Sequence, residues 1–168
     1  MLPPLVCLGL RKVYANGKVA VDGLSVKLRD GECFGLLGPN GAGKTTAISM
    51  LTGLTAPTSG QAAICGYDLQ EEIEQIYQRI GVCPQFDIVW PLLTVTESLR
   101  LYVRLKGVPH SMQSARVADH IRAVELDHVP HRLVGRLSGG MKRRVSLAIA
   151  FVGDSPVVRS RPDEQRCN

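Results

Sequence analysis

The chain has 168 residues, of which 45% are hydrophobic and 5% aromatic, with a formal net charge of +5. This length permits one compact domain or most of one and leaves no room for a second large domain. Scattered basic residues and few aromatic residues disfavour a nucleic-acid surface, so the phosphate of a small molecule is the simplest anionic partner. No apolar run reaches the ~18 residues that a membrane-spanning helix needs.

The first 37 residues predict a series of strands. Val6, Leu8 and Leu10 alternate with other residues, and turn signals follow at residues 16–17, 22–23 and 30–31. Residues 32–37 are then almost continuously apolar, which is typical of a strand buried inside a sheet. The sequence therefore predicts three antiparallel strands followed by one buried strand.

The stretch GPNGAGKTT, residues 38–46, fits the pattern G-x-x-x-x-G-K-[ST] and precedes a helix predicted over residues 44–52. Glycines let the backbone wrap around phosphate, Lys44 can reach the β- and γ-phosphates, and the Thr45 hydroxyl can ligate Mg²⁺. The alternative is a glycine-rich turn that binds no phosphate and contains a lysine by chance. We predict a purine nucleoside triphosphate with Mg²⁺, bound by Gly38, Pro39, Asn40, Gly41, Ala42, Gly43, Lys44, Thr45 and Thr46.

Helical signals dominate the following region. Thr94 and Glu97 form a capping box that predicts a helix ending near residues 107–109, and a second helix is predicted over residues 112–124. Before them, Gln85 stands at the end of a predicted strand, where α/β sheets usually contact ligands. Residues 137–141, LSGGM, open a further helix with a serine N-cap and two glycines, which is a second phosphate-binding device.

With both phosphate motifs in this order, residues 6–158 resemble the nucleotide-binding domain of ATP-binding-cassette (ABC) transporters. The resemblance implies an α/β fold, with a P-loop NTPase (RecA-like) core, an antiparallel β subdomain and a helical insert over residues 86–136. It implies ATP and Mg²⁺ as cofactors, with Thr45 and Gln85 at the metal and Tyr14 stacked on adenine. It also implies a head-to-tail partner cassette whose ATP is contacted by Leu137, Ser138, Gly139, Gly140 and Met141.

The sequences of residues 13–26 and 51–60 look like those of the A subfamily, whose full-length members move lipids or sterols across membranes. The resemblance thus implies transmembrane-domain partners, no nucleic acid, and a place on the cytosolic face of a membrane; the short chain alone would be soluble and cytosolic. Phe86, Trp90 and Leu92 are candidates for the contact with the membrane domain. A role in the core is an equally good interpretation of these three side chains.

The C-terminal residues depart from the family pattern. An apolar strand begins near residue 156, but Arg159 to Pro162 are not expected to continue a buried strand. The family continues to Asp-Glu at this point, whereas Asp163 and Glu164 stand two residues late. We therefore expect residues 159–168 to be a divergent, disordered tail and the fold to be incomplete at the C-terminus. Without the Walker B aspartate, the catalytic glutamate and the switch histidine, hydrolysis is expected to fall by at least ~10²–10⁴-fold.

Two alternatives remain at this point. The chain is either a cassette that binds Mg-ATP and hydrolyses it poorly or not at all, or a non-hydrolytic module that lends Ser138 and Gly140 to an intact cassette. A third class, soluble ABC ATPases that act in translation or on DNA, is disfavoured because no long basic or coiled-coil insert is present.

Overall fold

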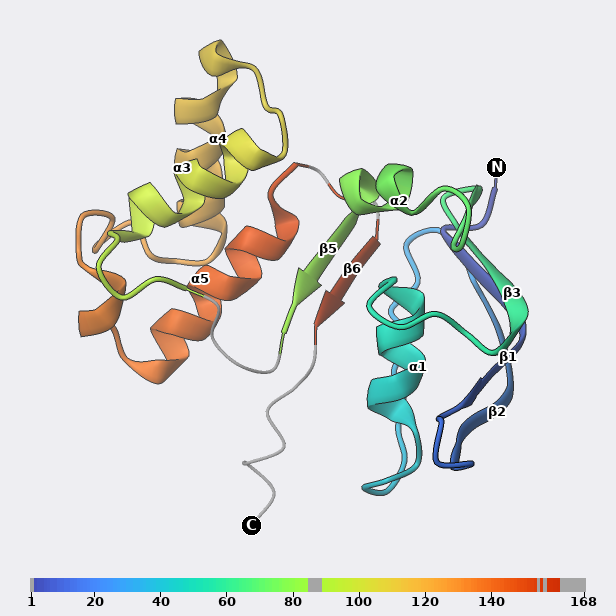
Figure 1. Ribbon diagram of the computed structural model, residues 1–168. Coiled ribbons are helices and arrows are strands. Elements are labelled where there is room, and N and C mark those ends of the chain that lie inside the picture. The colour runs from blue at the N-terminus through green and yellow to red at the C-terminus, as the bar shows by residue number, and fades with distance from the viewer. Residues whose placement is uncertain (1, 85–88, 154, 156, 161–168) are drawn as a thin grey trace. The chain divides into compact units, whose positions relative to one another are not determined.

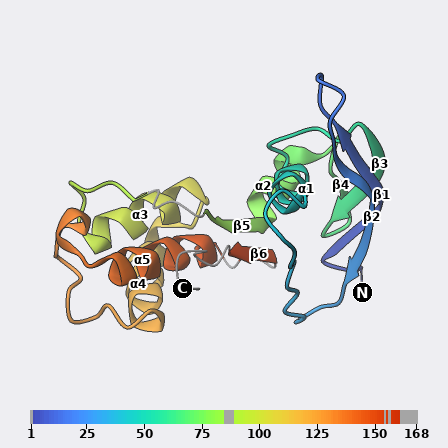
Figure 2. The same ribbon diagram turned by 90° about the horizontal axis from the view of Figure 1, so that it is seen from below.

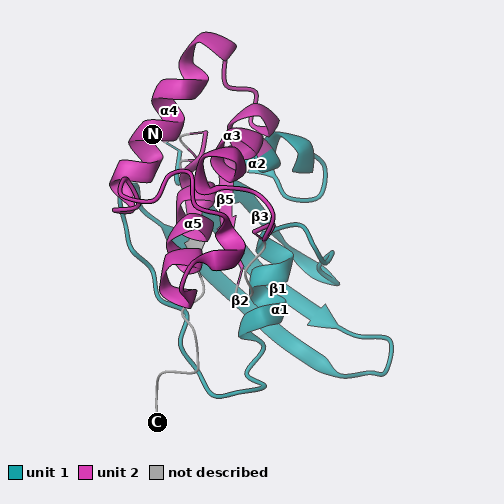
Figure 3. Cartoon of the chain, turned by 90° about the vertical axis from the view of Figure 1, so that its left-hand side faces the viewer, with its two compact units in different colours: residues 1–77 teal, residues 78–168 magenta. Residues whose placement is uncertain are grey.

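The computed structural model describes residues 2–84, 89–153, 155 and 157–160 (Figure 1). The chain divides into two compact units, residues 1–77 and residues 78–168, coloured separately in Figure 3. The predicted helical insert, residues 86–136, lies within the second unit. In the described part of the chain, no helix is both long and apolar enough to cross a membrane.

Unit 1 is built on a four-stranded antiparallel sheet with the order β2-β1-β3-β4 (Figure 2). Its strands are β1 (Leu5–Val13), β2 (Val19–Leu28), β3 (Ser59–Ile64) and β4 (Tyr67–Asp68). Helix α1 (Lys44–Leu51) follows the predicted phosphate loop and confirms the helix expected there, and the unit ends at residue 77 within α2 (Ile73–Arg79). Ala47 and Met50 on α1 are buried, as are Leu10 on β1 and Ile64 on β3.

A bulge interrupts β1 and changes which of its side chains are buried. The register with β2 shifts between Cys7 and Leu10, and Gly9 lies there with φ of 59°. Because the extra residue breaks the two-residue alternation, Cys7 and Leu10 are both buried while Leu8 is 61% exposed. The strand was predicted correctly, but Val6, Leu8 and Leu10 do not share one buried face.

The buried strand expected over residues 32–37 is not formed. These residues have no strand assignment, and Phe34 and Leu37 are 48% and 91% exposed. Cys33 is exposed as well, whereas Cys7 and Cys83 are buried. A buried central strand needs hydrogen-bonded neighbours on both edges. Within the described residues the strands of each sheet pair only with one another, so this apolar run has no partner strand.

Unit 2 combines a short parallel sheet with three helices. Strand β5 (Ile80–Cys83) pairs in parallel with β6 (Val157–Ser160). The helices are α3 (Val95–Leu105), α4 (His110–Ala123) and α5 (Gly139–Phe151), and a 3₁₀ turn, η1 (Val134–Arg136), precedes α5. Figure 1 shows α5 running beside α3 and α4, and their facing side chains form one hydrophobic core. The helices predicted before residues 107–109 and over residues 112–124 are confirmed by α3 and α4.

Strand β6 extends further than the sequence predicted. Arg159 pairs with Val82 and Ser160 pairs with Cys83, so the strand does not stop at Val158. Among the described residues β6 has one neighbouring strand, and Val157 and Val158 are half-buried, so it is not the buried central strand that Arg159 was expected to end. Asp163 and Glu164 lie outside the described residues.

Candidate nucleotide-binding site

The phosphate loop enters helix α1 through a glycine. Gly43 is the N-cap, with φ of 84°, and no side chain caps this helix end. Its carbonyl accepts the first helical hydrogen bond, from the Ala47 amide at 2.8 Å. The first amide groups of an α-helix have no partner within the helix, and together with the helix dipole they attract an anion. The local backbone therefore suits a phosphate group.

The sheet sets the position of this helix end. A Cβ added to Gly43 would collide with the backbone oxygen of Ala20 on β2 and would lie 3.3 Å from the Val21 side chain. Residue 43 therefore has to be glycine for two reasons, the positive φ and the close approach of β2. This packing keeps the phosphate loop against the sheet of unit 1, which is the rigid support that a binding loop requires.

Lys44 folds back over the loop that precedes it. Its Nζ donates hydrogen bonds to the carbonyl oxygens of Gly38 at 2.5 Å and Pro39 at 2.9 Å. The ammonium group is thus held across the loop by the Gly38 and Pro39 carbonyl oxygens. A positive charge and a row of amide donors on one short loop fit the phosphates of a nucleotide, and Thr45 in the first turn can supply an oxygen ligand to Mg²⁺.

Tyr14, which the resemblance places on adenine, lies beside the phosphate loop. Its hydroxyl is 3.3 Å from Thr46 Oγ1, and the residue is 41% exposed. A tight turn orients it, since the Tyr14 amide donates to Lys18 O at 3.0 Å. Lys12 Nζ lies 5.7 Å from the ring centroid and was not predicted as a site residue. Lys12 and Tyr14 are two positions apart, so an extended backbone brings them to one face, but the phosphate-loop motif does not include this lysine.

The second phosphate-binding motif opens helix α5 in unit 2. Ser138 is the N-cap, and its Oγ accepts a hydrogen bond from the Met141 amide at 3.3 Å. Leu137 is 6% exposed and anchors the motif in the core. Gly139 and Gly140 are exposed, with open space where a Cβ would stand. An anion can therefore approach the backbone of the first turn of α5.

Gln85 lies outside the described residues, so its predicted role is not tested. The preceding residue, Pro84, is described, and its carbonyl accepts a hydrogen bond from Arg143 Nη1 on α5. Arg143 was not predicted as part of the site. Because 59 residues separate the two partners, only the packing of α5 on β5 reveals the contact.

The structure thus gathers Tyr14 and the phosphate loop in unit 1 and the LSGGM motif in unit 2. The family described as "ABC transporter" matches residues 21–159 of the chain. Two sequence relatives are ABC transporter A family member 8 of Arabidopsis thaliana, 45% identical over 161 residues, and A family member 9 of Dictyostelium discoideum, 49% identical over 151 residues. They cover 92% and 89% of this chain, which spans only 18% of either relative.

Solved structures share the fold. A Clostridium perfringens protein described as part of an ABC transporter complex is 23% identical, with a TM-score of 0.85 over 94% of this chain and 64% of its own. A structure described as the ATP-binding subunit of an ABC transporter is 27% identical, with a TM-score of 0.82 over 92% of this chain and 64% of its own. The predicted P-loop NTPase fold of an ABC cassette and the resemblance to the A subfamily are therefore confirmed.

Proposed function

Because the chain belongs to the ABC transporter family, we propose that it binds Mg-ATP as a cassette of an A-subfamily transporter that moves lipids. One observation carries the ATP-binding part of this proposal. In unit 1, a glycine-capped helix end, the Lys44 ammonium and the half-exposed Tyr14 ring lie on one short loop and the turn beside it. These groups match the phosphates and the base of a nucleotide.

The residues of unit 1 have separate tasks in this proposal. The backbone amides of residues 43–46 bind the phosphate oxygens, and Lys44 Nζ exchanges its carbonyl partners for the terminal phosphates. Tyr14 stacks on the adenine, with its hydroxyl held near Thr46. Mg²⁺, held by Thr45, would neutralise charge on the β- and γ-phosphates.

The LSGGM motif acts on a second nucleotide. We propose that Ser138, Gly139 and Gly140 contact the ATP bound to a partner cassette in a head-to-tail pair, assisted by Leu137 and Met141. The exposure of both glycines and the N-cap geometry of Ser138 support this role, because they leave the first turn of α5 open to an anion. Pairing makes each ATP site depend on two chains or two domains.

The membrane partner belongs to the same proposal. Trp90 and Leu92 are 61% and 85% exposed, which favours a partner contact over the alternative of a core role. Phe86 lies outside the described residues. We propose that this apolar edge of unit 2 faces the transmembrane domains, so that the cassette works on the cytosolic side of a membrane. Transport of a lipid is a property of the whole transporter, and this chain spans less than a fifth of its A-family relatives.

Hydrolysis by this chain is proposed to be slow or absent. In residues 157–164 the acidic pair comes behind Arg159, Arg161 and Pro162, which separates it from the apolar start of β6. A hydrolytic cassette needs a metal-binding aspartate and a water-polarising glutamate that are fixed at a strand end. The chain then contributes ATP binding and its LSGGM motif to a pair in which the partner hydrolyses.

Calorimetric titration with Mg-ATP tests nucleotide binding. We expect saturable binding to the wild type and at least tenfold weaker binding to Lys44→Ala, because the variant loses charge-assisted hydrogen bonds to phosphate. Lys27→Ala removes the same charge from β2 and should bind like the wild type. The pairing is tested by titrating the chain into an intact cassette and measuring the ATPase rate. Equal affinity of wild type and Lys44→Ala overturns the ATP site, and an ATPase rate that does not change at any ratio overturns the pairing.

A further inference from the structure

Two segments of unit 2 that are far apart in the sequence are joined by a backbone ladder. The Gly135 amide donates to Pro91 O at 2.9 Å and the Val134 amide donates to Leu93 O at 2.8 Å. In the other direction, the Val95 amide donates to Arg132 O at 3.2 Å. Thr94 and Leu133 form an antiparallel bridge between these bonds. We call this arrangement, residues 91–96 with residues 130–135, the strap ladder.

The strap ladder continues into α3 at one end. The Thr96 amide and the Thr96 hydroxyl both donate to Pro130 O, at 3.0 Å and 2.8 Å. Val95 and Val134 are fully buried in the core of unit 2. The core beneath the strap ladder is closely packed, and several backbone hydrogen bonds join its two segments. We therefore expect the two segments to move together.

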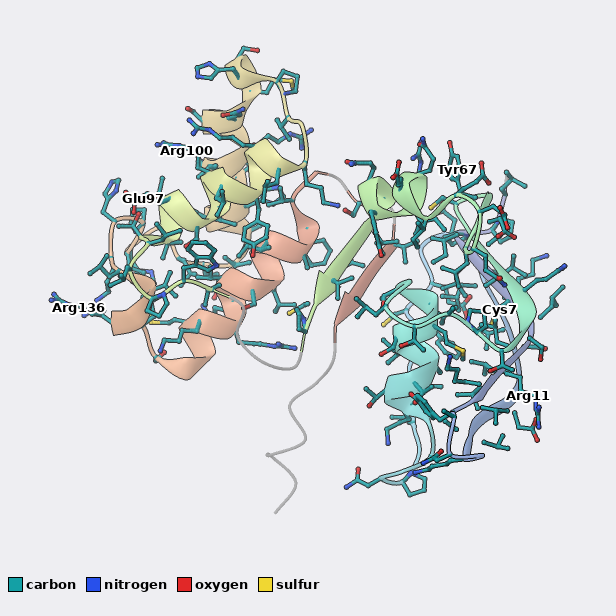
Figure 4. The ribbon with its side chains drawn as sticks, viewed as in Figure 1. Cys7, Arg11, Tyr67, Glu97, Arg100 and Arg136 are labelled. Carbon is teal, nitrogen blue, oxygen red and sulfur yellow. The ribbon has the colours of Figure 1, made fainter. Side chains whose placement is uncertain are left out.

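The other end of the strap ladder leads to Ser138. Turn η1 closes through a bond from the Arg136 amide to Leu133 O at 2.9 Å and one from the Leu137 amide to Val134 O at 3.1 Å. Leu137 is buried, and the next residue is the α5 N-cap. Figure 4 shows Arg136 pointing away from the body of unit 2, so this turn lies at the surface. Only two residues separate Gly135 from Ser138.

Gly135 is the tightest point of the strap ladder. A Cβ on this residue would lie 2.9 Å from Pro91 O and 3.1 Å from Pro91 Cβ. Its φ is not among the positive values, so the backbone itself would accept alanine. Space alone excludes a side chain there. Because Pro91 stands between the exposed Trp90 and Leu92, the same contact joins this apolar edge to the turn before Ser138.

From this juxtaposition we propose that Gly135 is a positioning residue for Ser138, and that the strap ladder links the position of Ser138 to the Trp90–Leu92 edge. The inference rests on the proposed function, because the place of Ser138 matters for the ATP of a partner cassette. A partner that moves the exposed edge moves Pro91, and the ladder carries that displacement to the first turn of α5. Conversely, when Ser138 binds the ATP of a partner cassette, the environment of Trp90 changes.

The chain has a single tryptophan, so Trp90 reports on this link without interference. The experiment uses the full chain labelled with 5-fluorotryptophan and an unlabelled, hydrolysis-deficient A-family cassette. The ¹⁹F signal of Trp90 and the extent of pairing, by sedimentation, are recorded with and without Mg-ATP. We expect Mg-ATP to induce pairing and to shift the signal in the wild type. In Gly135→Ala, pairing should be about tenfold weaker, since overpacking at Pro91 displaces the turn.

Matched variants separate positioning from folding. Gly35→Ala places a methyl group in open space and should behave as the wild type. Thr96→Val removes the hydroxyl bond to Pro130 O and should weaken both the shift and the pairing, whereas Thr96→Ser keeps the bond and should restore them. Binding of Mg-ATP to the chain's own phosphate loop, measured by calorimetry, should be unchanged in all four variants. A defect that is only structural would not appear in Thr96→Val and disappear in Thr96→Ser.

The outcomes are distinct. Pairing without a Trp90 shift in the wild type, or equal shifts in the wild type and Gly135→Ala, overturns this inference and leaves the proposed function standing. An absence of pairing overturns the proposed pairing, and the inference with it. A shift that disappears in Gly135→Ala and Thr96→Val and returns in Thr96→Ser supports the inference.

Discussion

The backbone oxygen of Ala20 occupies the space that a Cβ on Gly43 would need. Gly43 is the N-cap of α1 and Ala20 lies on β2, so this contact presses the start of the helix against the sheet. The contact leaves the amide groups of the phosphate loop on a rigid support. Substitutions at this position therefore test whether the support is needed for nucleotide binding.

Gly43→Ala should reduce both stability and Mg-ATP affinity. The new Cβ meets the Ala20 oxygen, and alanine is strained at a φ of 84°. A residue held in such a region costs roughly 1–3 kcal/mol even before the collision is counted. Gly41→Ala is the control, because it has a similar φ of 83° with nothing within 4 Å. Urea unfolding should show a clearly larger loss for Gly43→Ala, and equal losses would contradict a role for the contact with β2.

Substitutions of Tyr14 should weaken binding of the nucleotide's base and leave binding of its phosphates unchanged. Tyr14→Ala removes the proposed stacking surface, which is worth about 1–3 kcal/mol per base, so the affinity for Mg-ATP should fall at least about fivefold. Tyr14→Phe keeps the ring and loses only the contact with Thr46 Oγ1, so its affinity should stay close to that of the wild type. Binding of magnesium tripolyphosphate, which has no base, should be the same in all three proteins. A matching loss for tripolyphosphate would show that Tyr14 acts through the loop instead of through adenine.

Local signals in the sequence were sufficient for helices α1, α3, α4 and α5, whereas α2 was not predicted. The capping box predicted the start of α3, which begins directly after Thr94, and the phosphate-loop motif predicted α1 beginning at Lys44. The N-cap role of Ser138 was predicted in the same way. These features depend on residues three or four positions apart, so a short stretch of sequence contains the whole interaction.

Features that depend on distant partners were missed. The apolar run over residues 32–37 indicated a buried strand, but hydrophobicity does not show whether neighbouring strands are available. The bulge at Gly9 and the strap-ladder contact of Gly135 with Pro91 depend on how backbones approach one another. Arg143 likewise reaches the carbonyl of Pro84 only after α5 packs on β5. No local pattern encodes these contacts.

Acid should weaken the start of α3 through Glu97. The Thr94 amide and the Thr94 hydroxyl both donate to Glu97 Oε2 at 2.8 Å, and these bonds hold the pKa of Glu97 below its usual value. A carboxyl group with a lowered pKa in the folded state stabilises fully above its unfolded pKa of about 4.3, and this stabilisation is lost as the pH falls through the folded value. Urea midpoints measured from pH 6 to pH 3 should therefore fall more steeply for the wild type than for Glu97→Gln. Parallel curves for the two proteins would contradict the assignment to Glu97.

Lys106 should stabilise unit 2 mainly through its carbon chain. Its Nζ donates to Ile80 O at 3.0 Å, and a Cβ on Gly153 would lie 3.2–3.3 Å from the Lys106 Cβ, Cγ and Cδ atoms. The side chain thus connects the end of α3 with β5 and with the turn after α5. Lys106→Met keeps the packed chain and loses the hydrogen bond, so it should cost about 1 kcal/mol or less. Lys106→Ala loses both and should cost about 1–2 kcal/mol more, as measured by urea unfolding.

The pH dependence of Lys106 provides an independent check. Burial lowers the pKa of Lys106, so the folded state disfavours the charged ammonium. The unfolded chain therefore binds more protons than the folded chain between the lowered pKa and the ordinary value of about 10.4, and this group makes the free energy of unfolding rise as the pH rises through that window. Lys106→Met has no titrating group and should lack this rise. If Lys106→Met and Lys106→Ala destabilise the fold equally, the packing role of the carbon chain is wrong. If the stability of Lys106→Met depends on pH as that of the wild type does, the assignment of the titration to Lys106 is wrong.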